Sequence, residues 1–243
     1  MNQNLSTTVK QLTRSFREEL RHLSFAAPVA LIYNPLEYAE RGYFKYLDLA
    51  STGKKNTVFL GMNPGPWGMA QTGVPFGEIQ IAREWLKINE TIKKPANEHP
   101  KRPILGFDCE RSEVSGKRLW GYFKSRYETP ERFFKSHFIA NYCPLIFLEE
   151  SGRNRTPDKL LKSEREQLFA LCDKHLRDII ELLEPEILIG VGGFAERRLS
   201  HVFKDSPDLK IRKIMHPSPA NPNANRGWAE IAHQQLKEIL GEA

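Results

Sequence analysis

Residues 57–78 read TVFLGMNPGPWGMAQTGVPFGE and pass from a short apolar run into a loop rich in glycine and proline. The run over Thr57–Met62 predicts a buried β-strand. The loop over residues 61–78 holds five glycines and three prolines, which allow tight turns and also stiffen the backbone. A rigid loop of small residues directly after a strand is suited to hold a flat, uncharged heterocycle, although an ordinary long loop can have the same composition.

Three further apolar runs predict strands over Phe138–Tyr142, Glu186–Val191 and Ile211–Met215. Strands that alternate with helices predict an α/β fold, a three-layer sandwich whose central, four-stranded, mainly parallel sheet is flanked by helices. The length of 243 residues suits a single domain over residues 1–243. Residues 89–118 lack periodicity and are expected to form a surface excursion. Helical periodicity is found over Leu5–Leu23, Ile79–Ile88, Thr156–Leu183, Phe194–Phe203 and Trp228–Leu240.

The composition limits the class of protein without deciding its partner. Lys and Arg total 36 against 30 Asp and Glu, and the net charge of +6 permits a polyanionic partner. Cys109, Cys143 and Cys172 form no CxxC pair, which predicts reduced thiols and no metal site. With no signal peptide or membrane-length apolar run, we expect an intracellular protein, cytoplasmic and associated with the nucleoid in a bacterium or nuclear in a eukaryote.

Polar side chains follow the predicted strands where each of them ends. Asn63 comes just after the first strand, Asn141 lies near the end of the second, and His216 follows the fourth. Because ligands of open parallel sheets bind at the carboxyl ends of the strands, this edge is the predicted site. Phe76 is the candidate for stacking on a flat ring, and Trp67 is a weaker one.

The chemistry of these side chains favours a pyrimidine ligand. A carboxamide offers a donor beside an acceptor, so Asn141 can pair with N3–H and O4 of uracil; the flipped amide would pair with cytosine. Asn63 can orient a water molecule. His216 is the first residue of a stiff loop, HPSPANPNANRGW (216–228), of a kind that can enter a DNA groove. A turn-forming Asn, a hydrogen-bonded structural His and a helix cap are the structural alternatives.

Two more segments admit alternative interpretations. SGRNRTPDKLLKSER (151–165) places Arg153 and Arg155 at the entry to a predicted helix, where anions are favoured, but a solvated helix cap would have the same sequence. GVGGFA (190–195) matches G-x-G-x-x-A between a strand and a helix, so a dinucleotide-dependent α/β enzyme is an alternative. That motif follows the third strand rather than the first, and a tight strand-to-helix turn explains its glycines.

These motifs together resemble the single-strand-selective monofunctional uracil-DNA glycosylases, a branch of the uracil-DNA glycosylase superfamily. The resemblance covers nearly the whole chain. The residues that carry it are YNP (33–35), GMNPGPWGMAQTGVPFGE (61–78), EHPKRPILG (98–106), SEVSGKRLWG (112–121), NYCPLIFL (141–148), SGRNRTP (151–157) and HPSPANPNANRGW (216–228).

The resemblance implies an activity: hydrolysis of the bond between uracil and deoxyribose in single- and double-stranded DNA, which initiates base excision repair. It also implies 5-hydroxymethyluracil as a substrate, and deaminated purines are a further substrate class to test. Since no lysine or N-terminal proline is placed to attack the sugar, we expect no strand cleavage. We further expect a monomer that binds damaged DNA and needs no cofactor, with a non-catalytic DNA-binding relative as the alternative.

The resemblance also implies the roles of individual residues. Asn63 would position the attacking water and His216 would stabilise charge on the leaving base. Asn141 would read the Watson–Crick edge, and Phe76 would stack on the flipped ring. Met62 and Gly65 would shape the pocket near the base. The residues expected to contact DNA are Ser151, Gly152, Arg153, Asn154, Arg155, Ser218, Pro219, Ala220, Asn221, Asn225 and Arg226.

Two positions depart from the pattern of better-known members. Ala220 stands where they carry an Arg in the loop that wedges into the duplex, which puts the hold on duplex DNA in doubt. Trp67 replaces a common Phe, for which we expect little consequence.

Overall fold

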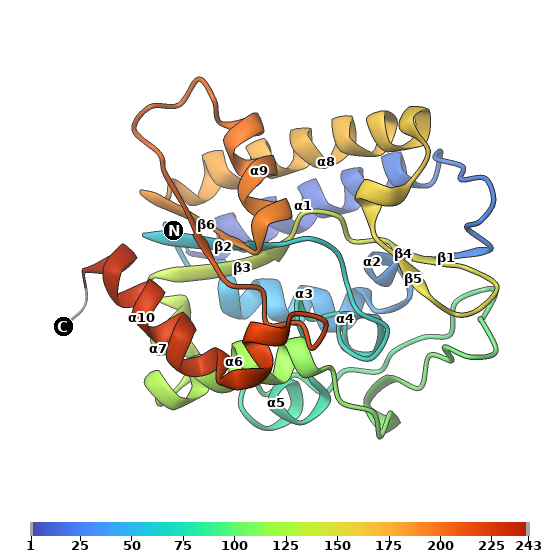
Figure 1. Cartoon of the computed structure of the whole chain (residues 1–243), viewed down its shortest axis with the longest axis horizontal. Helices are drawn as coiled ribbons and strands as arrows, with labels where there is room; N and C mark the ends of the chain where they lie inside the picture. The colour runs from blue at the N-terminus through green and yellow to red at the C-terminus, as the bar shows by residue number, and fades with distance from the viewer. Residues whose placement is uncertain (1, 242–243) are drawn as a thin grey trace.

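The computed structural model describes residues 2–241 and shows helices packed on both faces of a parallel sheet (Figure 1). The strand order is β3-β2-β6-β7, and all neighbouring strands are parallel. Each predicted strand is confirmed to within one residue at either end. The four strands are β2 (Thr57–Gly61), β3 (His137–Asn141), β6 (Ile187–Val191) and β7 (Lys210–Ile214).

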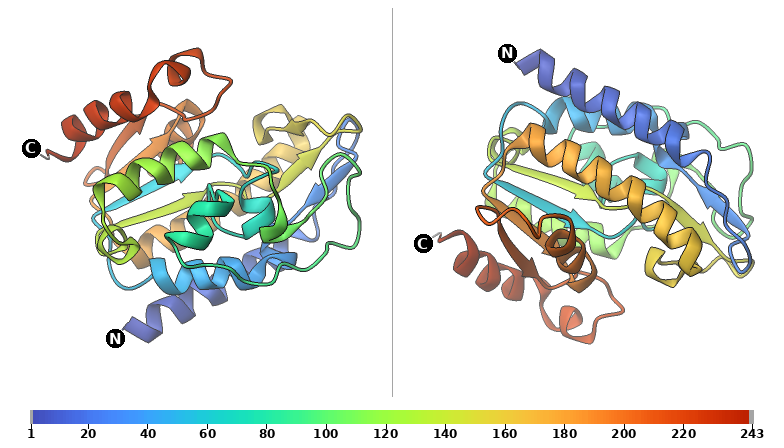
Figure 2. Two further views of the ribbon diagram at one scale, coloured as in Figure 1. Left: turned by 90° about the horizontal axis from the view of Figure 1, so that it is seen from below. Right: turned by 90° about the horizontal axis from the view of Figure 1, so that it is seen from above.

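The helices form two layers around this sheet. Helices α1 (Asn2–Leu20), α8 (Lys162–Leu183) and α9 (Gly193–Val202) cover one face, and α6 (Val114–Arg126), α7 (Pro130–Phe134) and α10 (Trp228–Leu240) lie on the other (Figures 1 and 2). All five residues of β2 are buried between them. The predicted three-layer α/β sandwich is therefore confirmed. The remaining helices are α2 (Pro35–Tyr38), α3 (Glu40–Ala50), α4 (Met69–Thr72), α5 (Ile79–Glu84), η1 (Gly106–Asp108), η2 (Pro157–Lys159) and η3 (Pro222–Arg226).

A second sheet was not predicted from the sequence. Strands β1 (Leu31–Tyr33), β4 (Ile146–Leu148) and β5 (Asn154–Arg155) pair antiparallel in the order β1-β4-β5. Runs of two or three residues are too short to show strand periodicity in a sequence. This sheet contributes to the site because the Asn154 side chain donates a 2.9 Å hydrogen bond to the carbonyl of Pro64 in the loop after β2.

The helix predicted over Thr156–Leu183 is interrupted in the structure. After η2 the backbone is extended at Leu160 and Leu161, and α8 begins only at Lys162. The prediction that Arg153 and Arg155 lie at the entry to the long helix is therefore wrong, because Arg155 belongs to β5 and is followed by the short helix η2.

The excursion over residues 89–118 is largely irregular, and its middle part is held by one buried side chain. The Gln71 amide donates 3.0 Å bonds to the carbonyls of Pro66 and Pro103, and its oxygen accepts from the backbone N–H groups of Leu105 and Gly106. The end of the excursion becomes the first turns of α6. Gln71 thereby ties this segment to the loop that follows β2.

Cys109, Cys143 and Cys172 are buried and free, as expected. Within residues 2–241 no helix is both long and apolar enough to cross a membrane, and no group of three or more His, Cys, Asp or Glu side chains could hold a metal ion.

Candidate active site

The ends of the parallel strands bring the predicted catalytic residues to one edge of the sheet. Gly61 of β2 lies opposite Asn141 of β3, and Val191 of β6 lies opposite Ile214 of β7, so Asn63 and His216 follow at the same edge. A cavity of about 260 Å³ opens there. It is lined by Met62, Asn63, Pro64, Gly65, Pro66, Met69, Phe76, Glu113, Ser115, Asn141, Asn154, Thr156, His216 and Ser218.

His216 is held as a neutral imidazole in this cavity. Its Nδ1 accepts a 3.1 Å hydrogen bond from the backbone N–H of Ser218, which leaves the ring proton on Nε2. Burial lowers the pKa of His216 to about 4. The ring rests on Gly192, where a Cβ would lie 3.0 Å from that of His216. His216 can therefore donate a hydrogen bond from Nε2, and it carries no charge at neutral pH.

Asn63 is oriented by the backbone of the chain that follows β3. Its Nδ2 donates a 3.2 Å hydrogen bond to the carbonyl of Leu145. The amide oxygen is the atom left to act on a ligand. An amide oxygen can accept a hydrogen bond from water and so orient it, but it is too weakly basic to remove a proton.

Asn141 and Phe76 lie against the same glycine. A Cβ at Gly61 would come within 2.4 Å of the Phe76 ring and 2.8 Å of Oδ1 of Asn141, so only glycine fits there. Nδ2 of Asn141 approaches Sδ of Met69 at 3.3 Å, which orients the carboxamide. The Phe76 backbone has a φ of 54°, in the left-handed region that non-glycine residues rarely adopt. The left-handed backbone of Phe76 and the absence of a Cβ at Gly61 thus place the Phe76 ring beside the oriented amide of Asn141.

Glu113 is a cavity residue that the sequence did not single out. A Cβ at Gly65 would lie 2.1 Å from Oε2 of Glu113, so the carboxyl fills the space beside this glycine. Oε2 also accepts a 3.3 Å hydrogen bond from the backbone N–H of Trp67. Burial raises the pKa of Glu113, and the bond from Trp67 lowers it in part. A Glu just before a helix is ordinary in sequences, so only its place in the motif SEVSGKRLWG (112–121) could have distinguished this carboxyl from a surface one.

The residues expected to contact DNA divide into two groups. Asn154 and Ser218 line the cavity itself, and Oδ1 of Asn154 is buried with no hydrogen-bond partner among residues 2–241. The other members lie outside the lining: Ser151, Gly152, Arg153, Arg155, Pro219, Ala220, Asn221, Asn225 and Arg226.

Several of the outer residues are engaged within the protein. Arg155 forms a 2.8 Å ion pair with Glu149, which reduces its capacity to bind phosphate. Asn225 donates to the carbonyl of Pro219 and accepts from Arg118, both at 2.9 Å. Asn221 caps η3 through the N–H of Asn223. The structural alternative for this loop, a helix cap, is therefore present at Asn221, and Asn225 holds the loop together instead of capping a helix.

The glycine-rich turn of the alternative interpretation has a packing explanation. A Cβ at Gly190 would lie 2.3 Å from the backbone nitrogen of Glu196, so the strand and α9 meet too closely for a side chain. Gly192 has a φ of 92° and carries the His216 ring. The glycines are required by contacts within the protein, and nothing in their geometry favours a dinucleotide.

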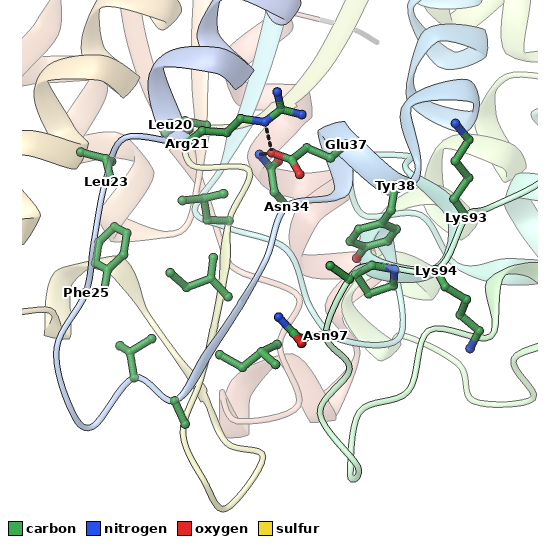
Figure 3. A pocket seen from close by; sticks show the side chains of 17 residues that line it. Leu20, Arg21, Leu23, Phe25, Asn34, Glu37, Tyr38, Lys93, Lys94 and Asn97 are labelled. Atoms are coloured by element: carbon green, nitrogen blue, oxygen red, sulfur yellow. Dashed lines mark hydrogen bonds and ion pairs between the residues drawn. The ribbon is translucent and has the colours of Figure 1, made fainter.

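A larger cavity of about 810 Å³ lies elsewhere and shares no lining residue with the active-site cavity. Figure 3 shows Leu23 and Phe25 on one side of it and Lys93 and Lys94 on the other. None of the predicted catalytic or base-binding residues lines it. Size alone therefore does not identify the site.

Comparisons with known proteins agree with this geometry. Residues 48–239 match the family model described as the uracil DNA glycosylase superfamily. The chain is 45% identical over 223 residues to the single-strand selective monofunctional uracil DNA glycosylase of Bos taurus, covering 91% of this chain and 82% of that protein. The corresponding protein of Rattus norvegicus is 46% identical over 222 residues, with 91% and 80% covered.

Among solved structures, wild-type SMUG2 of Pedobacter heparinus matches with a TM-score of 0.66, covering 95% of this chain and 97% of that one. Its sequence identity of 16% makes this a likeness of fold. The family model, the two mammalian relatives and the convergence of Asn63, Asn141 and His216 on one cavity together show that the chain belongs to the uracil DNA glycosylase superfamily.

Proposed function

We propose that this protein hydrolyses the glycosidic bond of uracil in DNA and leaves an abasic site. The observation that carries the proposal is a single cavity lined by an oriented amide, a second oriented amide, an aromatic ring and a neutral imidazole. These are the groups that would bind water, read a pyrimidine edge, stack on the base and stabilise a leaving anion. The base must leave the stack to enter the cavity, which favours unpaired or damaged bases.

The bond changes follow from the positions of these groups. Oxygen of the water held by Asn63 bonds to C1′ of the sugar, and the C1′–N1 bond breaks with its electron pair passing to uracil. Nε2–H of His216 donates to O2, where the negative charge develops. The proton lost by the water passes to solvent, and uracil is then protonated. Since a neutral donor acts at O2, an anion can be stabilised without a charged side chain.

Recognition of uracil would depend on Asn141. Its oxygen would accept from N3–H while its NH₂ group, with one hydrogen toward Met69, donates to O4. Cytosine would set donor against donor and acceptor against acceptor. Phe76 would stack on the ring, and Met62 and Gly65 would bound it.

We further propose that the enzyme acts on single- and double-stranded DNA, as an intracellular monomer forming one domain over residues 1–243. 5-Hydroxymethyluracil and deaminated purines belong to the range of substrates to be measured. Hydrolysis without strand cleavage is supported by the lining of the cavity, which includes no lysine among the described residues.

The proposal is tested with a single-stranded oligonucleotide that carries one uracil, treated with hot alkali after incubation. We expect alkali-dependent cleavage by the wild type and no borohydride-trapped adduct. Asn63→Ala and His216→Ala should be slower, the latter by about 100- to 1,000-fold, as when one oxyanion donor is removed. His22→Ala, at an exposed histidine, is the control. A wild type that binds this DNA without releasing uracil would instead be the non-catalytic relative.

A further inference from the structure

Trp67, Arg102 and Arg111 form a cluster at the border of the active-site cavity. The guanidinium carbon of Arg111 lies 4.6 Å from the centroid of the Trp67 ring, and that of Arg102 lies 5.3 Å from it. Both distances are in the range of cation–π contacts. We call these three residues the arginine–tryptophan cluster.

The cluster is held on a buried scaffold. The Gln71 amide bonds to the carbonyls of Pro66 and Pro103, the neighbours of Trp67 and Arg102 in sequence. The Tyr33 hydroxyl, on a ring only 1% exposed, donates a 2.7 Å bond to the carbonyl of Arg102. Arg102 therefore comes from an irregular segment whose backbone is fixed where it meets Trp67, and Arg111 follows nine positions later in the same segment.

The positive charges of the cluster are not neutralised within the protein. Neither Arg102 nor Arg111 has a carboxylate oxygen within ion-pair distance among residues 2–241, whereas Arg155 and Arg198 do. Nη1 of Arg102 donates a 2.8 Å hydrogen bond to the carbonyl of Lys101, and Nε of Arg102 is buried, so the terminal nitrogens are the atoms that can reach a phosphate. Guanidinium groups that are held in place and keep N–H donors free of other hydrogen bonds are suited to bind phosphate.

The cluster borders the same cavity as the loop that begins at His216. Pro66, next to Trp67, and Glu113, two residues after Arg111, both line the cavity, as does Ser218 in the other loop. Lys101, the neighbour of Arg102 in sequence, lies against Gly152 of the expected DNA-contact set, since a Cβ at Gly152 would lie 3.1 Å from that of Lys101. A strand with one base in the cavity has to leave across the rim of the cavity, and this border is one part of that rim.

We propose that the arginine–tryptophan cluster binds phosphates of the DNA strand that carries the extruded base. This rests on the proposed function and assigns phosphate binding to residues outside the expected DNA-contact set. The loop over residues 216–228 has Ala220 where better-known members carry an Arg, so it offers no cation at that position. The two arginines of the cluster contribute positive charge from residues 89–118, a segment that was expected only to form a surface excursion.

The test is the salt dependence of binding, measured by fluorescence anisotropy. The probe is single-stranded DNA that carries a 2′-fluorinated, hydrolysis-resistant deoxyuridine. The slope of log K against log salt is negative, and for single strands its magnitude falls by about 0.7 for each phosphate that the protein no longer neutralises. We expect Arg102→Gln and Arg111→Gln each to reduce the magnitude of the slope by that amount, the double variant to reduce it by about 1.4, and Arg102→Lys to leave it unchanged.

Arg177→Gln is the matched control. Like the two cluster arginines, Arg177 forms no ion pair with the described residues. It lies near the end of α8, where the carbonyl of Leu183 accepts a hydrogen bond from the N–H of Lys55, just before β2 begins. That end of the sheet is opposite the cavity, so the slope measured for Arg177→Gln should equal that of the wild type. Thermal unfolding of each variant checks that the fold is retained.

A double variant with wild-type affinity and slope would overturn the proposal. The slope is read without catalysis, so it separates this proposal from the proposed function: a wild type that fails to release uracil leaves the binding result interpretable. Single-turnover rates at saturating protein should stay within about threefold of wild type in the cluster variants, because the cluster does not line the cavity.

Discussion

Ser218 donates its backbone N–H to Nδ1 of His216 at 3.1 Å, and this bond fixes both the tautomer and the position of the imidazole. Because burial also lowers the pKa of His216 to about 4, the ring is neutral across the physiological range. Protonation would begin only as the pH falls toward 4. Protonation of Nδ1 would remove the lone pair that accepts the hydrogen bond from the N–H of Ser218.

The first prediction is that uracil release shows no inflection near pH 6.5, the ordinary pKa of histidine. Single-turnover rates between pH 5.5 and 8 should be unchanged by the titration of His216. The series is repeated in Glu113→Gln, so that ionisation of that carboxyl is not mistaken for histidine. A rate that rises tenfold as the pH falls through 6.5 in both proteins would mean that a cationic imidazole is the active form.

The second prediction concerns Gly61, where a Cβ would lie 2.4 Å from Phe76 and 2.8 Å from Asn141. Gly61→Ala should displace both base-binding groups and lower the single-turnover rate by about 100-fold, as expected for a misplacement of roughly 1 Å. Gly121→Ala is the control, because no atom lies within 4 Å of its added Cβ. In α6 that change should raise stability by about 0.5–1 kcal/mol and leave the rate unaltered.

The third prediction separates shape from charge at Glu113. Because its folded pKa is raised, the folded state holds the proton more tightly, and stability falls as the pH rises from about 4.5 through that folded pKa. Glu113→Gln removes this ionisation, keeps an acceptor for Trp67, and should raise the Tm at pH 7. Glu113→Ala leaves the N–H of Trp67 without its partner and should lower stability by about 1–3 kcal/mol. Melting both variants at pH 5 and pH 7 tests this; equal Tm values for Gln and Ala would contradict it.

The fourth prediction concerns Arg118 of α6, which donates 2.9 Å bonds to the carbonyl of Pro217 and to Oδ1 of Asn225. These bonds hold both ends of the loop expected to enter the duplex. Arg118→Ala should therefore slow release of uracil from duplex DNA by about tenfold more than from single strands, since only the duplex must be opened. Lys117→Ala, at the exposed neighbour, should affect neither substrate. Equal losses on both substrates would assign Arg118 to the fold instead.

The fold could be predicted where hydrophobic periodicity extends over enough residues. The four parallel strands and α10 match the expected segments closely, because burial between helices leaves continuous apolar runs. Strands β1, β4 and β5 were missed because they are too short to show a period. The long helix was extended too far, since the extended backbone at Leu160 and Leu161 has no turn residues to mark it.

The candidate site followed the same logic. Asn63, Asn141 and His216 could be found because each lies at the end of a strand or just after it, and the topology then brings them together. Glu113 could not, because its approach to Gly65 joins segments that are 48 positions apart in sequence. The DNA contact expected of Arg155 stays a prediction, and the sequence did not indicate its ion pair with Glu149, which comes just after β4.

The four hydrogen bonds of Gln71 have a consequence for the energetics of binding. They order the irregular chain around Pro103–Gly106 when the protein folds, so its conformational entropy is already lost before any ligand arrives. Association with a flexible strand then requires ordering of the nucleic acid alone. A protein surface of this kind is expected to bind with little heat-capacity change from coupled folding.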